Sequence, residues 1–335
     1  MLVNKSSDSG DDSFTYSEIS LPRPVRFWIM LLFNVPSLIC SFCLIFYTII
    51  NRHQRHALHN HTILLLLIFG LPTQLMDINF YLVFYHYGII LPSAPILCLL
   101  WWFEDYGFYN GCLFLMCWLA IERHILIFHD QWVSNRRRRL IFHYLPLILI
   151  VAYILIFYIY VIFFLPCENT YVYTVPVCGA SPCYQSYGVL GMFEFIVNTT
   201  IPIMLEGIVS VALIIRVQWQ KRRLRQSNKW RKNRRMIIQL LLVSAVNTIL
   251  NLPISLIPIA HLCGLPPEYG VQAELYFFFL NYFVIFLFPF VSLSQFPSLR
   301  KRMRMRIFPV PPREQNFTPT AIRHPITRIP MVRLS

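Results

Sequence analysis

Charged residues are scarce in this chain of 335 residues. Asp, Glu, Lys and Arg together make up only 13% of it, whereas a soluble domain carries about 25%. Hydrophobic residues reach 56%, so too little polar surface is left to cover a soluble globule. Nine cysteines are too few for a disulfide scaffold, and 16% aromatic residues exclude a disordered chain. The composition is typical of a protein that crosses a membrane several times.

The common enzyme motifs are also absent from the sequence. It contains no HExxH, no GxSxG, no phosphate-binding loop and no histidine cluster with metal-ligand spacing. We therefore expect no catalytic residues, no cofactor and no metal site.

Seven apolar stretches are near the length of about 20 residues that a membrane-spanning helix needs. We predict an all-α membrane protein, a seven-transmembrane helix bundle with a short amphipathic helix after helix seven. Residues 27–295 form the bundle, 1–26 the N-terminal segment, and 296–335 that helix followed by a disordered tail. The predicted spans are residues 27–51, 62–86, 95–128, 141–165, 190–216, 236–262 and 273–295.

The basic residues predict the orientation. With the N-terminus outside, all but three of the 29 Lys and Arg residues fall on the inner side, the exceptions being Lys5, Arg23 and Arg26. Cytoplasmic loops are enriched in Lys and Arg, so we predict an extracellular N-terminus and a multi-pass protein of the plasma membrane. The basic loops then contact anionic membrane lipid, not nucleic acid. Asn4, in Asn-Lys-Ser, is a candidate glycosylation site on the outer side.

The third apolar stretch carries distinctive residues at both ends. Arg123, in Glu122-Arg123-His124, lies 25 residues after Cys98, roughly 37 Å along a helix and hence a full membrane crossing. Prolines at 202, 253 and 289 interrupt the last three stretches. This combination resembles the rhodopsin-like family of G-protein-coupled receptors over residues 27–305.

The resemblance implies a function at each face of the membrane. It implies a cell-surface receptor that binds an extracellular ligand in the helical bundle and activates a heterotrimeric G protein. Glu122, Arg123 and His124 resemble the family's switch, in which the acid holds the arginine until helix six moves outward. A different class, a seven-helix transporter or channel, would need polar residues along a through-path, and the inner halves of helices four, six and seven are almost wholly apolar.

Three positions depart from the family pattern. Asn251 stands two residues before Pro253, where the family usually has Trp, and Gly70 stands roughly where the family carries an aspartate. Residues 288–292 read Phe-Pro-Phe-Val-Ser in place of Asn-Pro-x-x-Tyr. These differences indicate a divergent branch with an altered activation route.

Acidic residues within spans are candidates for ligand binding, because ionisable groups there are rare and usually face the interior. Asp105 lies seven residues after Cys98, roughly 10 Å down the helix, and resembles the carboxylate with which amine receptors of the family bind an ammonium group. Asp77 and Glu194 are further candidates. The ligand would be a cationic amine or a basic peptide. The alternative for each acid is a buried carboxyl bonded to Tyr, Asn or backbone, and we expect Glu206 to be structural.

The resemblance also implies a disulfide from Cys98 to the second outer loop. That loop holds Cys167, Cys178 and Cys183. We choose Cys183 as the partner because it lies 19 residues before Pro202, with Cys178 as the alternative. Cys167 then pairs with the remaining loop cysteine, and Cys263 makes the outer total odd.

Overall fold

The computed structural model describes residues 18–133, 135–179, 182–223, 227–266 and 269–294, together with 296 and 299. Within these ranges every regular element is a helix. Asn4 and the tail that is predicted to be disordered lie outside the described residues, as does nearly all of the amphipathic helix predicted from residue 296.

Seven helical stretches are long and apolar enough to cross a membrane, which confirms the predicted seven-helix all-α fold. Their bounds are Arg23–Ile50, Asn60–Tyr87, Pro95–Phe128, Arg136–Phe164, Gly188–Trp219, Leu242–Leu262 and Val271–Leu293. The elements that compose them are α2 (Arg23–Ile50), α4 (His59–Pro72), η1 (Thr73–Asp77), α5 (Ile78–Tyr87), α6 (Pro95–Trp102), η2 (Phe103–Phe108), α7 (Tyr109–Phe128), α8 (Arg136–Arg139), η4 (Leu140–Tyr144), α9 (Leu145–Ile159), η5 (Tyr160–Phe164), α10 (Gly188–Phe193), η8 (Glu194–Thr200), α11 (Ile201–Arg223), α12 (Ser227–Leu262) and α13 (Val271–Leu293). The short helix α3 (Arg52–Arg55) connects the first two spans.

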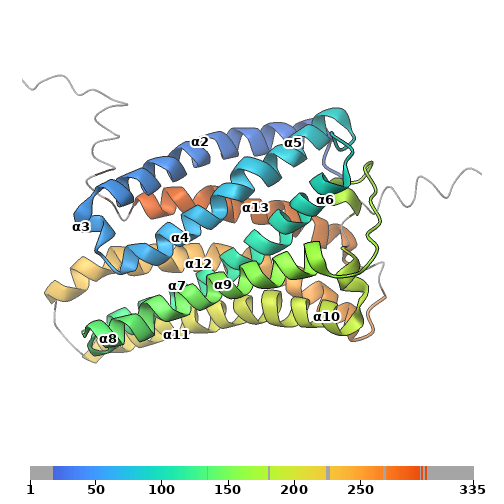
Figure 1. Cartoon of the computed structure of the whole chain (residues 1–335). Helices are drawn as coiled ribbons and strands as arrows, with labels where there is room; N and C mark the ends of the chain where they lie inside the picture. The colour runs from blue at the N-terminus through green and yellow to red at the C-terminus, as the bar shows by residue number, and fades with distance from the viewer. Residues whose placement is uncertain are drawn as a thin grey trace, which may run out of the picture. The chain divides into compact units, whose positions relative to one another are not determined.

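The spans run alongside one another (Figure 1). The first span, α2, contacts both α5 and α13, so the first span packs against the second and the seventh. The third span is central, because α7 contacts α4, α9, α11 and α12. Side chains of α7 can therefore connect helices that do not touch each other.

Four of the spans contain a turn of π-helix, in which the backbone hydrogen bonds are one residue wider than in an α-helix. The second span has η1, the third η2 and the fifth η8. Such turns are frequent at functional sites. Each of these three holds one of the candidate ligand-binding acids: Asp77, Asp105 and Glu194 respectively.

Polar side chains lie inside the bundle and many apolar ones face outward. Asn34 Nδ2 of the first span donates to the backbone oxygen of Gln74 at 3.0 Å, and Gln74 Nε2 donates to Ser37 Oγ at 3.0 Å. Large apolar side chains such as Phe46 and Ile148 are 60% and 63% exposed. Polar contacts between helices and apolar side chains on the outside of the bundle are typical of a protein surrounded by lipid. The chain is therefore a multi-pass membrane protein.

The orientation of the chain can be tested with epitope tags. We expect a tag before residue 1 to bind antibody on intact cells, and a tag after residue 335 to bind only after permeabilisation, because basic loops stay in the cytoplasm. Flow cytometry of both tagged proteins, with total expression as the control, measures this. The opposite staining contradicts the predicted topology.

Candidate functional site

A cavity of about 710 Å³ lies among the spans, within the range of ligand pockets in proteins. Six of the seven spans contribute to its wall, together with the segment before α2 through Ile19 and the loop between the fourth and fifth spans through Val177. In the predicted orientation this is the second outer loop. One residue from each of those spans is Arg26, Tyr81, Asp105, Glu194, Pro258 and Tyr282. The cavity therefore lies at the end of the bundle that carries this loop.

The wall of this cavity holds more carboxyl groups than basic groups. Its acids are Glu18, Asp105, Glu194 and Glu274, whereas Arg26 is the single Lys or Arg among the lining residues. Arg26 already pairs with Glu18. The lining thus has a surplus of carboxyl groups, which suits a cationic ligand better than an anionic one.

Asp105 lies between two cavities. Its half-buried side chain lines the large cavity and also a much smaller one beside it. Asp77 and Glu104 line the small cavity as well, with Tyr109 and Tyr282 shared by both. The structure therefore brings three carboxyl groups of the second and third spans together, and among them only Asp105 reaches the large cavity.

Asp77 occupies a different place from the one predicted for a ligand contact. Its buried carboxylate accepts hydrogen bonds from Trp101 Nε1 at 2.7 Å and from the Tyr282 hydroxyl at 2.8 Å, and it does not line the large cavity. These two partners satisfy the carboxylate and join the second, third and seventh spans. Asp77 thus fits the alternative of a bonded, structural carboxyl.

Glu194 lines the large cavity but is already hydrogen-bonded. Its carboxylate accepts from the Tyr158 hydroxyl at 3.0 Å, from Gln185 Nε2 at 3.3 Å and from Asn110 Nδ2 at 3.4 Å. All three donors are uncharged and come from the fourth span, the outer loop and the third span. Glu194 therefore presents a carboxyl group to the cavity from a fixed position.

A chain of hydrogen bonds leads inward from the cavity. The Tyr109 hydroxyl donates to Asn251 Oδ1, Asn251 Nδ2 donates to Asn247 Oδ1 at 2.8 Å, and Asn247 Nδ2 donates to Glu206 Oε2 at 2.6 Å. The chain links α7, α12 and α11. It passes through Asn251, where the family usually has Trp. The signal in the sequence was a pair of Asn residues four apart in an apolar helix, which sequence reasoning did not use.

Two disulfides fix the second outer loop. Cys98 pairs with Cys178, and Cys167 with Cys183, so the first choice of Cys183 as the partner of Cys98 is wrong and the alternative is correct. Trp102 Nε1 donates to the Val177 backbone oxygen at 2.8 Å, which holds the loop next to Cys178 against the third span. Cys263 is a free cysteine.

This pairing predicts unequal effects of removing the two bonds. Cys98→Ser/Cys178→Ser should reduce surface delivery more than Cys167→Ser/Cys183→Ser. The first bond closes a separation of 80 residues and the second one of 16, and the chain-entropy model gives the longer loop about 1 kcal/mol more stabilisation. Surface labelling and free-thiol counts measure this, since each double variant leaves no new thiol.

The opposite pairing has its own signature. If Cys98 bonded Cys183, each of these double variants would leave two unpartnered thiols, and the thiol count would rise by two in both.

The triplet Glu122, Arg123 and His124 lies at the end of the third span that is predicted to be cytoplasmic. Glu122 accepts from the Thr62 hydroxyl, and its other oxygen lies 2.9 Å from His143 Nδ1, an ion pair when the imidazole is protonated. Arg123 is buried, with 1% of its surface exposed. His124 Nε2 lies 2.9 Å from Arg216 Nη1 of α11. The side chains of Glu122 and His124 thus connect the third span to the second, fourth and fifth.

His143 extends the contacts of Glu122 toward the first inner loop. Its Nε2 lies 3.0 Å from His61 Nδ1, and His61 Nε2 donates to the backbone oxygen of Arg55 at 2.8 Å. Sequence reasoning missed His143, because a histidine at the start of an apolar span carries no positional signal. Among the described residues, no group of three or more His, Cys, Asp or Glu side chains is arranged to hold a metal ion.

No family model matches this sequence, and no curated protein matches it. Membership of the rhodopsin-like family therefore stays a prediction, which is based on the resemblance of particular residues.

Proposed function

We propose that this protein is a plasma-membrane receptor that binds an extracellular cationic ligand between its helices and activates a heterotrimeric G protein. The observation that carries the proposal is the cavity of about 710 Å³, whose wall holds four carboxyl groups and one guanidinium that is already paired. Asp105 is the acid we assign as counter-ion, because it reaches the cavity and its side chain is partly exposed there.

The inner end of the third span supports the second half of the proposal. A buried arginine within a span is costly unless it has a function or a partner. Arg123 stands one membrane crossing from Cys98, and Glu122 is held by Thr62 and His143. In this arrangement, the acid is fixed by the second and fourth spans. Outward movement of helix six would then expose Arg123 to the G protein.

A ligand screen tests the proposal. The full chain is expressed with a promiscuous G-protein reporter and exposed to cationic amines and basic peptides, each matched with a neutral analogue of the same shape. We expect responses only to cationic members, and none in cells that lack the chain. Uptake or current that a compound elicits without a reporter response, and that persists in Arg123→Ala, would favour a transporter or channel.

A further inference from the structure

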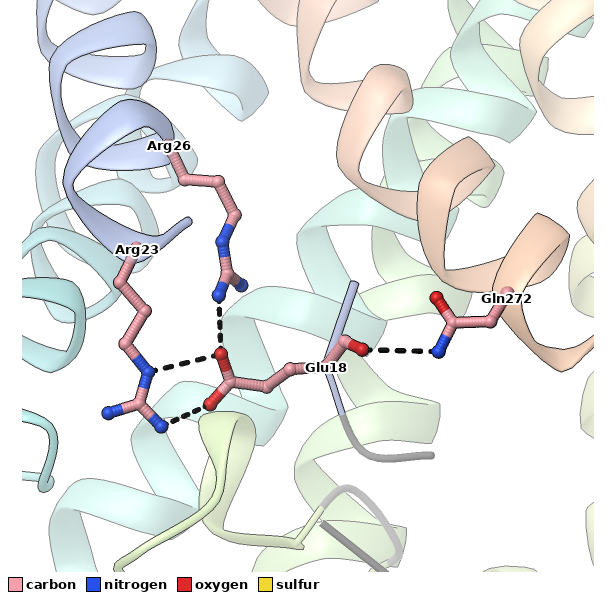
Figure 2. Close-up of polar contacts among 4 residues, drawn as sticks. All are labelled: Glu18, Arg23, Arg26 and Gln272. Carbon is pink, nitrogen blue, oxygen red and sulfur yellow. Dashed lines mark hydrogen bonds and ion pairs between the residues drawn. The ribbon is translucent and has the colours of Figure 1, made fainter. Parts of the chain in front are cut away.

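Two arginines converge on one carboxylate at the outer end of the first span (Figure 2). Arg23 Nε and Nη2 lie 3.1 Å and 2.5 Å from the two oxygens of Glu18, and Arg26 Nη2 also donates to Glu18. Burial by itself raises the pKa of Glu18, and the hydrogen bonds and charges of the two arginines outweigh it, so this pKa lies below its ordinary value. The carboxylate is thus charged and held by two cations.

Part of this cluster belongs to the cavity wall. Glu18 and Arg26 both line the large cavity, and the side chain of Arg26 is only 5% exposed. The Arg26 guanidinium also lies over the ring of Tyr85 at 4.6 Å, and Tyr85 lines the cavity too. An arginine in this position can contact a bound molecule, unlike one that points into solvent.

One N–H donor of Arg26 is not used by Glu18. Its Nε is buried and has no hydrogen-bond partner among the described residues, so Glu18 engages the guanidinium through Nη2 alone. Guanidinium groups bind carboxylates best through two parallel N–H donors. A carboxylate that takes the place of Glu18 can therefore bond Arg26 through both Nε and Nη2.

Glu18 and the two residues after it contact the bundle. Its backbone oxygen accepts from Gln272 Nε2 at 3.3 Å, as Figure 2 shows. Ser20 Oγ lies 2.5 Å from the Tyr276 hydroxyl, and Ile19 is buried. The segment before α2 thus reaches from the first span to α13. Its Glu18 carboxylate is bound by Arg23 and Arg26 of the same chain.

We infer that Arg26, with Arg23 beside it, forms a carboxylate-binding subsite in the cavity wall, and that Glu18 is its intramolecular occupant. The ligand class inferred below rests on the proposed function, because it requires Asp105 to bind a cationic group. A ligand of this class carries a cationic group for Asp105 and a carboxylate that displaces Glu18 from Arg26. Amino-acid derivatives and short peptides with a free C-terminus have this chemistry.

Chemical rescue tests the subsite without any ligand. Glu18→Ala should lower the melting temperature of the purified full chain by about 2–4 °C, and propionate should restore it saturably by entering the vacated position. Propionamide, and chloride at equal ionic strength, should not. Wild type should show no such rescue, because Glu18 fills the subsite. Glu18→Ser serves as a second vacating variant if Glu18→Ala is not delivered to the membrane.

Arg26→Gln in the Glu18→Ala background decides whether the arginine is the receptor for the anion. We expect the rescue to disappear in the double variant. The subsite is contradicted if propionate stabilises Glu18→Ala and the double variant equally. It is also contradicted if propionate stabilises neither Glu18→Ala nor Glu18→Ser. Glu168→Gln, on the exposed outer loop, is the matched control for the loss of one outer carboxylate.

A pair of peptide pools tests the ligand class. The probes are tetrapeptides with free C-termini and the same tetrapeptides amidated, and retention on the purified chain is read by mass spectrometry. Glu18→Gln should retain free-acid peptides at least about tenfold more than wild type and amidated ones equally. A different result is that amidated peptides bind in a way that Asp105→Asn abolishes, while Glu18→Gln changes the retention of neither pool. This result supports the proposed function and contradicts the subsite. Retention of neither pool by any variant contradicts both.

Discussion

Replacing Asp105 with Asn is expected to weaken the binding of a cationic ligand at least about thirtyfold. The substitution keeps the shape and hydrogen bonding of the side chain and removes its charge. Truncating one partner of a buried charge pair costs about 2–5 kcal/mol, and about 2 kcal/mol corresponds to thirtyfold in affinity. Asp105 is the acid to which this applies, because it lines the large cavity and Asp77 does not.

Dose-response curves of an agonist from the screen measure the effect. Glu168→Gln, which removes an exposed outer carboxylate, should leave the curve unchanged and controls for the general field of the outer surface. Glu194→Gln should have a smaller effect, because uncharged donors already bond that carboxylate. An unchanged curve for Asp105→Asn would show that Asp105 is a structural acid.

Arg123→Ala is expected to reduce agonist-stimulated G-protein signalling to background while ligand binding stays measurable. The side chain is 1% exposed and lies at the opposite end of the third span from Cys98, so its loss removes the proposed contact to the G protein without touching the cavity. Reporter output at saturating agonist, normalised to surface expression, is the measurement. Arg52→Ala removes an exposed arginine of α3 and is the matched control.

A buried arginine truncated to alanine leaves a void, so a second variant is needed. Arg123→Gln fills most of that volume and keeps hydrogen-bonding groups. We expect it to signal as poorly as Arg123→Ala at normal surface expression. Full signalling by Arg123→Gln would show that the charge is not used, and would contradict the switch assigned to Arg123.

The spans were predictable because bilayer thickness sets the length of an apolar run. The third span was predicted at 95–128 and begins and ends at Pro95 and Phe128. The fourth was predicted from residue 141 but starts at Arg136, because the four arginines before the apolar run still form helix. Hydropathy locates a membrane crossing, whereas helix ends depend on local hydrogen bonding.

Helical spacing did not separate Asp105 and Glu194, which line the large cavity, from Asp77, which does not. Asp77, Asp105 and Glu194 each lie in a π-helical turn, which rotates the residues beyond it relative to an ideal α-helix. The partners of Glu122 also come from other spans, and Thr62 and His143 carry no mark of that role in the sequence. Contacts between distant segments depend on packing, which one sequence does not reveal.

The hydrogen-bonded chain through Asn251 and Asn247 opposes rotation of the sixth span. Both residues belong to α12, and the chain ends on a different helix at each side, at Tyr109 and at Glu206. A rotation of α12 therefore breaks bonds to two neighbours together, and each buried group left without a partner costs about 1–3 kcal/mol. Such a rotation therefore has to cross an energy barrier. A molecule that draws the Tyr109 hydroxyl away from Asn251 removes one of these bonds beforehand and so lowers the barrier from the cavity side.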